Sequence, residues 1–552
     1  MMLYWFHSAK QWRTLGKFLG LFFICCFLVI SCRSVPVSNT PASPIASSPS
    51  TNRITFGTTA NIRTLDPADA YELWAGNLLY NLGDRLYTYE LGTTNLKPQL
   101  ATALPTVSAD GLTYTIPLRQ GVVFHDGTPF DAEAMAFSLN RFIKNGGQPA
   151  FLLGDTIASV EATGADELTI KLKRPFAAFP AMLAFSGACA ISPKAYEIGS
   201  DKFKPDTFIG TGPYKLAKYG SDSMRLEVFS QYWGDKPANE GIDIQKFSSP
   251  ANLYNAFRTG AVDVAYQTLD LDQIRSLKQE STTTNWQVIE GQGGGIYYLT
   301  INLKSKPLEQ VAVRQAIAAI IDRPLLQERV FQGQVEPLYS LIPTTLDTYQ
   351  PVFKDEYGDG NIAKAQAALA KAGYSKANPL VVELWYRSNI TSNALVATTI
   401  KASVAQKLEG AMQIDLKSVE SATAYQNLDK GAYPLFILDW TPDFLDPDNY
   451  IQPFMDCSKG SVSTGCEEGS SKGQGSFYYS DRVNKLIGQQ RQEQDPQARQ
   501  KLFGELQTIL AQDVPFIPLW QSKEHLFAQK GIQGARLEAT QKVPFTTLKK
   551  SS

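Results

Sequence analysis

The chain is predicted to be a multidomain α/β protein, and three features of the sequence lead to that prediction. At 552 residues it is longer than an ordinary single domain, so two or three domains are expected. Strand-like runs and amphipathic helices are interspersed along the whole chain, which is typical of a mixed α and β architecture. No repeat of 20–50 residues is visible, which argues against a solenoid.

The segment LTYTIPL is predicted to form a half-buried strand. Its apolar side chains alternate along the chain and therefore share one face of the strand, namely Leu112, Tyr114, Ile116 and Leu118. The turn HDGTP follows, and Asp131 is then placed to cap a helix.

Two later segments are predicted to be helices because each carries a helix cap. NIAKAQAALAKAGY begins after Asn361 and ends at Gly373. DPQARQKLFGELQTIL has Asp495 as its N-cap and Pro496 in its first turn. The apolar face of this second helix consists of Leu502, Phe503, Leu506, Ile509 and Leu510.

Residues 1–31 have the organisation of a bacterial signal peptide. Basic residues precede a thirteen-residue apolar run, Phe18 to Ile30, which is shorter than the ~20 residues of a membrane-spanning helix. The run ends in VISC, which resembles the lipobox of bacterial lipoproteins and implies cleavage before Cys32 and lipid attachment to it. An ordinary signal peptide or an uncleaved anchor is the alternative. Residues 32–52 are rich in Ser, Pro and Thr and are predicted to be a flexible tether.

The cysteines, histidines and charges narrow the possible functions further. Cys457 and Cys466 flank a Gly/Ser-rich loop outside the cytosol and are predicted to form a disulfide, which would contribute roughly 2–3 kcal/mol at most. Cys189 lies in an apolar stretch and is predicted to be buried. Beyond the leader only His125 and His525 remain and CxxC is absent, which argues against a histidine zinc centre. Neither a bound metal nor a cofactor is expected. The 52 basic and 53 acidic residues leave no basic excess, so nucleic-acid binding is not expected.

Several segments, taken in order, resemble the bacterial extracellular solute-binding proteins of family 5, which serve peptide and nickel ABC importers. The most specific of them is DGLTYTIPLRQGVVFHDGTPFDAEAMAFSLNRF, residues 110–142. Others are NLGDRLY at 81–87, GTGPY at 210–214, AFRTGAVDVAY at 256–266 and VRQAIAAIIDR at 313–323. The matches extend from residue 54 to about residue 520, which is nearly the whole chain after the tether.

The resemblance implies the class II periplasmic-binding-protein fold, with two α/β lobes joined by hinge strands and an extra α+β domain inserted in the first lobe. Lobe I is expected in residues 53–80, 200–290 and 513–548, the extra domain in 81–199, and lobe II in 291–512.

In function, the resemblance is to the oligopeptide-binding members of the family. It implies a monomeric binding protein that is lipid-anchored at the membrane in the periplasm or another extracytoplasmic space. Such a protein captures peptides by lobe closure and delivers them to ABC permease subunits and their ATPases. It performs no chemistry on the solute, so an enzyme is not expected.

The segment LFILDWTPDFLDPDNY places four aspartates after an apolar run. Their spacing does not supply the ligands of an EF-hand, and nothing specific indicates a glycosidase pair. Trp440–Pro447 resembles a motif of the peptide-binding members in which the first aspartate anchors the free α-amino group of the peptide. That position is Asp443 here, and a carboxylate in a closed cleft would pair strongly with an ammonium group and reject solutes that lack one.

The neighbouring acids are expected to have other roles. Asp446, before Pro447, is predicted to form a turn, and Asp448 is predicted to be a solvated loop residue. Asp439 stands where the family usually has Gly, and the sequence offers no explanation for it.

Five aromatic residues are further candidates to line the cleft: Trp440, Tyr297, Tyr298, Trp385 and Tyr386. The stretch GQGGGIYY, residues 291–298, lacks the Walker Lys-Ser/Thr pair, so a nucleotide site is not expected there. Its glycines would instead let the backbone approach a neighbouring segment or a ligand closely.

The nature of the solute is less constrained. Dipeptide-specific relatives place an Arg near the start of the helix after a strand similar to LVVELWYRSN. Here that region has Asn393, and Arg387 lies earlier, so a longer peptide held as an added strand is expected. The alternatives are the same fold with a nickel chelate, a sugar or an opine-like solute, a sensor or chaperone lipoprotein, and a secreted hydrolase. The lack of a Ser-His, Cys-His or HExxH constellation speaks against the hydrolase.

Overall fold

The computed structural model of the protein describes residues 52–284 and 286–551. The predicted leader, the lipid-attachment residue Cys32 and the tether up to residue 51 lie outside the described residues. Within those two described ranges, no helix combines the length and the hydropathy needed to cross a membrane.

An eleven-stranded sheet is the main structural element. Its strands follow in the order β15 (Met412–Val419), β14 (Leu380–Arg387), β16 (Leu435–Trp440), β12 (Gln287–Ile301), β19 (Phe516–Ala528), β11 (Val264–Tyr266), β1 (Ile54–Thr58), β10 (Gly241–Lys246), β9 (Ser223–Val228) and β8 (Tyr214–Tyr219). The short strand β13 (Val335–Pro337) also pairs with β19.

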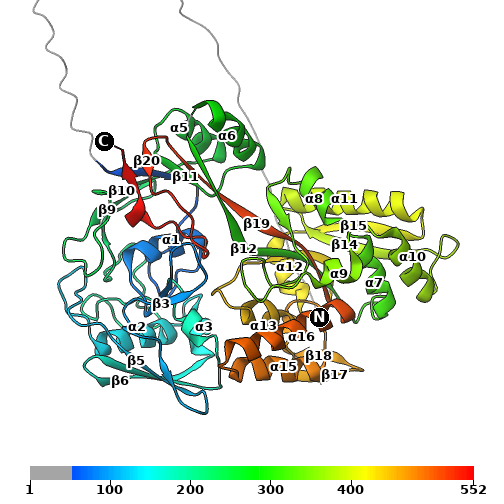
Figure 1. Ribbon diagram of the computed structural model, residues 1–552, viewed down its shortest axis with the longest axis horizontal. Coiled ribbons are helices and arrows are strands. Elements are labelled where there is room, and N and C mark those ends of the chain that lie inside the picture. Colours follow the sequence, from blue (N-terminus) through cyan, green and yellow to red (C-terminus); the bar gives the residue numbers. More distant parts are fainter. Residues whose placement is uncertain (1–51, 285, 552) are drawn as a thin grey trace, which may run out of the picture. The chain divides into compact units, whose positions relative to one another are not determined.

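Two long strands stand between two parallel groups in this sheet. β14 runs parallel to β15 and β16, and β1 runs parallel to β10 and β11. β12 and β19, with 15 and 13 residues, pair with each other in antiparallel fashion and connect the two groups (Figure 1). Each group therefore has the parallel pairing typical of α/β units, and β12 and β19 are shared between them.

The glycines of GQGGGIYY interrupt the ladder between these two strands. β12 pairs with β19 through Gln287–Gln292 and again through Ile296–Thr300, with an irregularity between the two stretches. A Cβ atom on Gly293 would lie 2.1 Å from Oγ of Ser522, so the strands could not approach so closely with any larger residue there.

A second sheet of four strands has its own core. It consists of β4 (Thr106–Val107), β5 (Thr113–Pro117), β7 (Glu167–Leu172) and β6 (Ile157–Gly164), and α2 (Ala132–Lys144) packs against it. The predicted alternation in β5 is confirmed, because Tyr114 and Ile116 are fully buried. The predicted cap is confirmed too, since the Asp131 carboxylate accepts a 2.9 Å hydrogen bond from the backbone N–H of Ala134.

The remaining helices cover the sheets or connect their strands. They are α1 (Leu73–Leu82), α3 (Ala150–Gly154), α4 (Phe179–Met182), α5 (Pro250–Arg258), α6 (Leu271–Thr284), α7 (Val311–Ile320), α8 (Arg323–Arg329), α9 (Val352–Tyr357), α10 (Ile362–Lys371), α11 (Thr391–Leu408), α12 (Ser421–Leu428), α13 (Asp448–Met455), α14 (Ser470–Gly473), α15 (Asp481–Gln492) and α16 (Pro496–Asp513). Both predicted helices are present, since the side chain of Asn361 caps α10 and that of Asp495 caps α16.

Three two-stranded sheets and one 3-10 helix complete the described chain. The sheets are β2 (Tyr87–Tyr89) with β3 (Leu96–Pro98), β17 (Lys459–Ser461) with β18 (Gly465–Glu468), and β20 (Ile532–Gln533) with β21 (Lys549–Lys550), and the 3-10 helix is η1 (Phe545–Thr547).

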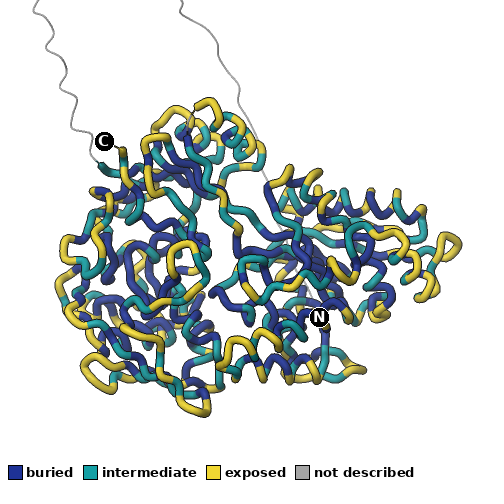
Figure 2. Tube along the Cα trace, in the orientation of Figure 1, coloured by how far each residue is buried: buried dark blue, intermediate teal, exposed yellow. Residues whose placement is uncertain are grey.

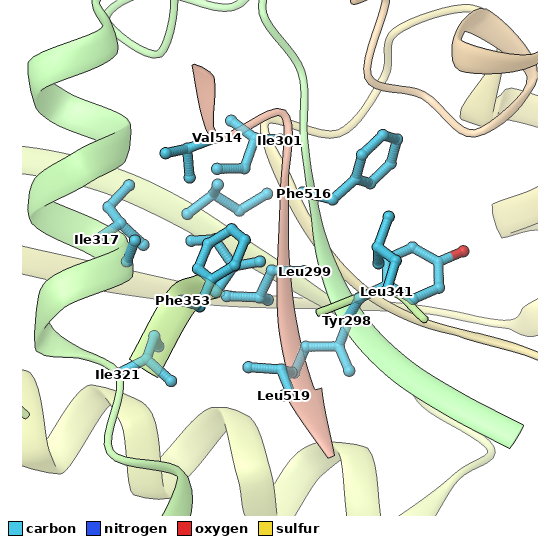
Figure 3. Close-up of a cluster of buried hydrophobic side chains, with 14 of the residues drawn as sticks. Tyr298, Leu299, Ile301, Ile317, Ile321, Leu341, Phe353, Val514, Phe516 and Leu519 are labelled. Carbon is cyan, nitrogen blue, oxygen red and sulfur yellow. The ribbon is translucent and has the colours of Figure 1, made fainter. Parts of the chain in front are cut away.

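The largest hydrophobic cluster surrounds the halves of β12 and β19 that pair with each other next to β16. Leu299 and Ile301 of β12 meet Phe516 and Leu519 of β19 there, and Ile317 of α7 packs against them (Figure 3). Exposed residues gather in loops and on outer helix faces, while the strands are largely buried (Figure 2).

Candidate functional site

A cavity of about 270 Å³ lies beside the loop that follows β16. Five stretches of chain contribute to its wall: residues 70–80 around the start of α1, 88–89 in β2, 181–187 after α4, 441–445 after β16, and 539–542 near the C-terminus. Gly294 of β12 completes the lining.

Asp443 forms part of the wall of this cavity. Its Oδ1 accepts a 2.5 Å hydrogen bond from the hydroxyl of Tyr71, and its backbone N–H donates to Oδ1 of Asn449 at 3.0 Å. Among the described residues, no Lys, Arg or His nitrogen lies within 4.0 Å of the Asp443 carboxylate, the limit for an ion pair. Burial raises the pKa of the Asp443 carboxyl to about 6, although hydrogen bonding with Tyr71 and Asn449 opposes this shift.

The loop that carries Asp443 is held in place by the acids that follow it. Asp446 forms a turn as predicted, because its Oδ1 accepts from the backbone N–H of Asp448 at 2.8 Å. It also forms a two-pronged ion pair with Arg499 of α16, with both distances 2.7 Å. Such bidentate pairs restrain both partners geometrically, so the turn is anchored to α16.

The prediction that Asp448 is a solvated loop residue is wrong. Its side chain is 1% exposed and forms an ion pair with Arg491 of α15 at 2.6 Å. The reason is that the chain turns directly into α13 at this point and packs against α15, whose guanidinium group compensates the buried charge. That partner is 43 residues away in the sequence, so local reading could not reveal it.

Asp439, which had no explanation from the sequence, forms an ion pair with Arg387 of β14. Arg387 is 5% exposed, and its Nη1 also donates to the hydroxyl of Tyr425 at 2.9 Å. A Gly at position 439 would leave this buried guanidinium without a carboxylate, which is costly. Arg387 is therefore engaged with Asp439 and Tyr425 inside the chain.

The five aromatic candidates do not line the cavity that contains Asp443. Tyr297 stacks on Trp520 with ring centres 4.7 Å apart, and Trp440 packs edge-on against Phe454. Tyr298 is 1% exposed within the core around β12 (Figure 3). Its hydroxyl donates to Gln474 at 2.9 Å.

The remaining two candidates lie on β14. Trp385 packs against Tyr433 with ring centres 5.0 Å apart and donates its ring N–H to Glu383. Tyr386 is half-buried against the same cluster that contains Tyr298. The structure thus brings Asp443 together with none of the five aromatic residues in one cavity.

Other aromatic residues line the cavity beside Asp443. Tyr71 and Phe185 lie in the cavity wall with their ring centres 6.3 Å apart, edge to face. Tyr89 of β2 also lines it, and its hydroxyl accepts a 3.2 Å hydrogen bond from the backbone N–H of Leu445. No local pattern around these three residues distinguishes them from core aromatics, because their role follows from contacts with a loop more than 250 residues later.

Gly294 was indicated by the sequence, since GQGGGIYY was expected to allow close approach of the backbone. A Cβ atom there would lie 3.0 Å from Cγ of Pro442 and 3.1 Å from the hydroxyl of Tyr450. The Gly294 carbonyl accepts a 2.9 Å hydrogen bond from that hydroxyl. The glycine therefore lets the loop of Asp443 pack directly on β12.

One cation, Lys542, also lines the cavity. Its Nζ donates to the carbonyl oxygen of Leu73 at 3.4 Å. Burial lowers the pKa of the Lys542 ammonium to about 8, the positive charge of Arg85 adds to this shift, and Glu524 opposes it. The sequence contained no signal for Lys542, which lies in an irregular segment near the C-terminus.

The cysteines are arranged as follows. Cys457 and Cys466 are joined by a disulfide with an S–S distance of 2.08 Å, and Cys189 is buried with a free thiol. In the described part of the chain, no group of three or more His, Cys, Asp or Glu side chains is arranged to hold a metal ion.

Comparison with known proteins identifies a family and several relatives. A family model described as "Bacterial extracellular solute-binding proteins, family 5 Middle" matches residues 95–461. The chain is 26% identical over 492 residues to the probable D,D-dipeptide-binding periplasmic protein DdpA of Escherichia coli strain K12, covering 87% of this chain and 90% of that protein. It is 28% identical over 481 residues to the glutathione-binding protein GsiB of Escherichia coli O6:K15:H31, covering 83% and 87%.

The fold agrees as well. HbpA2 from Haemophilus parasuis superimposes with a TM-score of 0.79 at 22% identity, over 91% of this chain and 100% of that one. The predicted fold class, that of the two-lobed class II periplasmic binding proteins, is thereby confirmed. Because the family match covers more than half of the 552 residues, the chain belongs to the bacterial extracellular solute-binding proteins of family 5, the solute-binding components of ABC importers.

Proposed function

We propose that the protein captures peptides with a free amino terminus and delivers them to an ABC permease and its ATPases. The observation that carries this proposal is the state of Asp443, a largely desolvated carboxylate without a cationic partner among the described residues, in the wall of a cavity. An ammonium group placed there would gain a strong charge-assisted hydrogen bond, and a neutral solute would leave the carboxylate unpaired.

Two relatives support a peptide as the solute. By their names, one is a probable D,D-dipeptide-binding protein and the other a glutathione-binding protein. Both ligands are small peptides, so the peptide class is compatible with the family as well as with the cavity.

Capture is proposed to occur by closure of two lobes about β12 and β19. The lobes would comprise residues 53–80, 200–290 and 513–548 on one side and 291–512 on the other, with 81–199 as the extra domain. The broken ladder at Gly293–Gly295 supports a hinge there, because a ladder with fewer hydrogen bonds bends more easily. A ligand that contacts both Asp443 and the start of α1 would bind the closed form better than the open one and so shift the equilibrium toward it.

We further propose that the mature chain is a monomer outside the cytoplasm, attached to the membrane by lipid on Cys32. The support is the basic leader, its apolar run and the VISC sequence that precedes the tether. A tether of about twenty residues would let the binding protein reach a permease in the same membrane.

A thermal-shift panel tests the solute class. Peptides with free amino termini at about 100 μM should raise the melting temperature, because a ligand that binds only the folded state stabilises it. N-acetylated versions of the same peptides should raise it much less. If a nickel chelate, a sugar or an opine-like compound raises the melting temperature while free peptides leave it unchanged, the peptide proposal is wrong.

A further inference from the structure

The cavity beside Asp443 contains one unpaired charge of each sign. Three of its lining residues are charged, namely Glu72, Asp443 and Lys542. Glu72 is already paired with Arg63 at 3.1 Å. Neither Asp443 nor Lys542 forms an ion pair within 4.0 Å with any residue that the structure describes. An unpaired, desolvated charge of each sign in one cavity indicates a ligand that itself carries both signs.

The surroundings of Lys542 favour an anion beside it. Its Nζ contacts the carbonyl oxygen of Leu73, the first residue of α1, at 3.4 Å. The amino-terminal end of a helix carries a partial positive charge, so this end of α1 repels a cation and attracts an anion. The contact with this carbonyl oxygen is the one favourable interaction between the ammonium and the helix among the described residues, and a ligand carboxylate would be attracted by both the ammonium and the helix end.

A glycine in α1 leaves space for this ammonium, and a backbone hydrogen bond restrains the turn that carries Lys542. A Cβ atom on Gly76, inside α1, would lie 3.1 Å from Nζ of Lys542. Glycine inside a helix is less favourable than alanine, and here it leaves space for the lysine. The backbone N–H of Glu538 donates to the carbonyl of Lys542 at 2.9 Å, which closes a turn.

Gln541 ties this turn to β12. With its amide oriented so that the oxygen faces the strand, it accepts from the backbone N–H of Gly294 at 2.6 Å and of Gly295 at 3.3 Å. Lys542 is thus placed next to the same glycines on which the loop of Asp443 packs.

The two unpaired charges contact neighbouring positions of the chain. Asp443 accepts from Tyr71, which precedes α1, and Lys542 donates to Leu73, the first residue of α1. The cavity volume of about 270 Å³ is near the lower end of the range that holds small molecules. An extended tripeptide is only about 10 Å long, whereas the terminus of a longer peptide would project beyond such a cavity.

We propose that Lys542 binds the carboxylate terminus of the solute while Asp443 binds its amino terminus, so that the solute is a zwitterionic peptide of roughly two or three residues. This inference rests on the proposed function, since it concerns the same site. It also replaces the longer peptide that the sequence led us to expect. Arg387, the other basic residue considered for this role, is engaged with Asp439.

Calorimetric titration with matched peptides tests the role of Lys542. The ligands are L-Ala-L-Ala and L-Ala-L-Ala-L-Ala, each as the free acid and as the C-terminal amide. The wild-type protein should lose at least about 30-fold in affinity on amidation, because the ammonium is left without its carboxylate. In Lys542→Gln, amidation should change the affinity by no more than about 3-fold, since the discriminating charge is gone. Lys542→Arg keeps the charge and should retain the preference for the free acid.

Lys530→Gln is the matched control, because Lys530 is exposed and does not line the cavity. It should behave as the wild type does. Equal affinity of the wild-type protein for acid and amide would overturn the inference without any variant. An unchanged cost of amidation in a folded Lys542→Gln would overturn it too, while peptide binding itself would still stand. Failure of all four peptides to bind the wild type would overturn this inference. It would overturn the proposed function as well only if longer peptides with free amino termini also left the melting temperature unchanged.

Discussion

The hydroxyl of Tyr71 donates a 2.5 Å hydrogen bond to Oδ1 of Asp443, which is 372 residues later in the chain. This contact joins the segment before α1 to the loop after β16 and forms part of the cavity wall. A phenol satisfies the carboxylate without neutralising its charge. The cavity therefore keeps a negative charge available for a cationic group of the solute.

Replacing Tyr71 by Phe should move the pH dependence of peptide binding. An ammonium group binds the ionised form of Asp443, so affinity is lost as the pH falls through the pKa of about 6. The Tyr71 hydrogen bond holds this pKa down against burial, and its loss should raise the pKa further. Titrations from about pH 5 to 7.5 should show the acid limb at higher pH in Tyr71→Phe, with about 1–2 kcal/mol lost at pH 6.

Tyr71 and Asn449 hydrogen-bond with Asp443 and Tyr450 lies near it, and none of the three carries a charge near pH 6. The charged residues that line the same cavity, Glu72 and Lys542, form no hydrogen bond with Asp443 in the part of the chain that the structure describes. Tyr479→Phe is a suitable control, because it removes a 2.6 Å hydrogen bond to Asp481 that lies outside the cavity wall. An acid limb at the same pH in Tyr71→Phe and in the wild type would show that the phenol does not tune the carboxylate.

Asp443→Asn should stabilise the protein when no ligand is present. The folded state raises the pKa of this carboxyl to about 6, so the folded protein binds more protons than the unfolded one between about pH 4 and 6. Ionised Asp443 thus opposes folding above pH 6, and this cost disappears below about pH 4. Denaturant titration at about pH 7.5 should give a free energy of unfolding that is higher by about 1–2 kcal/mol.

The same substitution at Asp415, an exposed residue of β15, serves as the control and should leave the free energy of unfolding nearly unchanged. A lower free energy of unfolding for Asp443→Asn would mean that the carboxylate stabilises the free protein, contrary to its assignment as a ligand-binding group.

Asp439 and Arg387 should be energetically coupled. Asp439→Ala leaves a guanidinium that is 5% exposed without its carboxylate, so about 2–4 kcal/mol of unfolding free energy should be lost. Adding Arg387→Met removes the orphaned charge and should restore most of the loss. A double-mutant cycle measured by urea unfolding gives the coupling free energy between the two residues. Strictly additive effects would show that the pair does not stabilise the protein.

Much of the fold could be predicted, because it depends on local patterns. The alternation in β5 and the caps at Asp131, Asn361 and Asp495 are short-range features, and each is present in the structure. Hydrogen bonds from a cap reach only two or three residues along the chain, so the sequence near a helix end contains the information that specifies it.

The site was less accessible from the sequence, because its contacts are long-range. Asp448 is an acid in a segment rich in loop formers, yet its charge is compensated by Arg491. Asp439 likewise depends on Arg387, 52 residues earlier. Lys542 lines the cavity from a turn that Gln541 ties to Gly294 and Gly295. No local spacing rule connects these positions.

Cys32→Ala should abolish lipid attachment. The thiol and the new amino group of Cys32 are the proposed acceptors, so the variant should lose incorporation of radiolabelled palmitate and leave the membrane fraction on cell lysis. Cys25→Ala, inside the apolar run of the leader, is a matched control and should still be labelled. Equal labelling of Cys32→Ala and the wild type would place the lipid elsewhere.

The role of Asp443 as the group that binds the amino terminus is tested most directly by calorimetry at about pH 7.5. The affinities of L-Ala-L-Ala-L-Ala and its N-acetyl derivative are compared in the wild type, in Asp443→Asn and in Glu72→Gln. Glu72 is the other cavity carboxylate and already forms an ion pair with Arg63. The wild type and Glu72→Gln should prefer the free amine by at least about 30-fold, and Asp443→Asn should reduce that preference to about 3-fold or less. The same preference in Asp443→Asn as in the wild type would contradict the assignment.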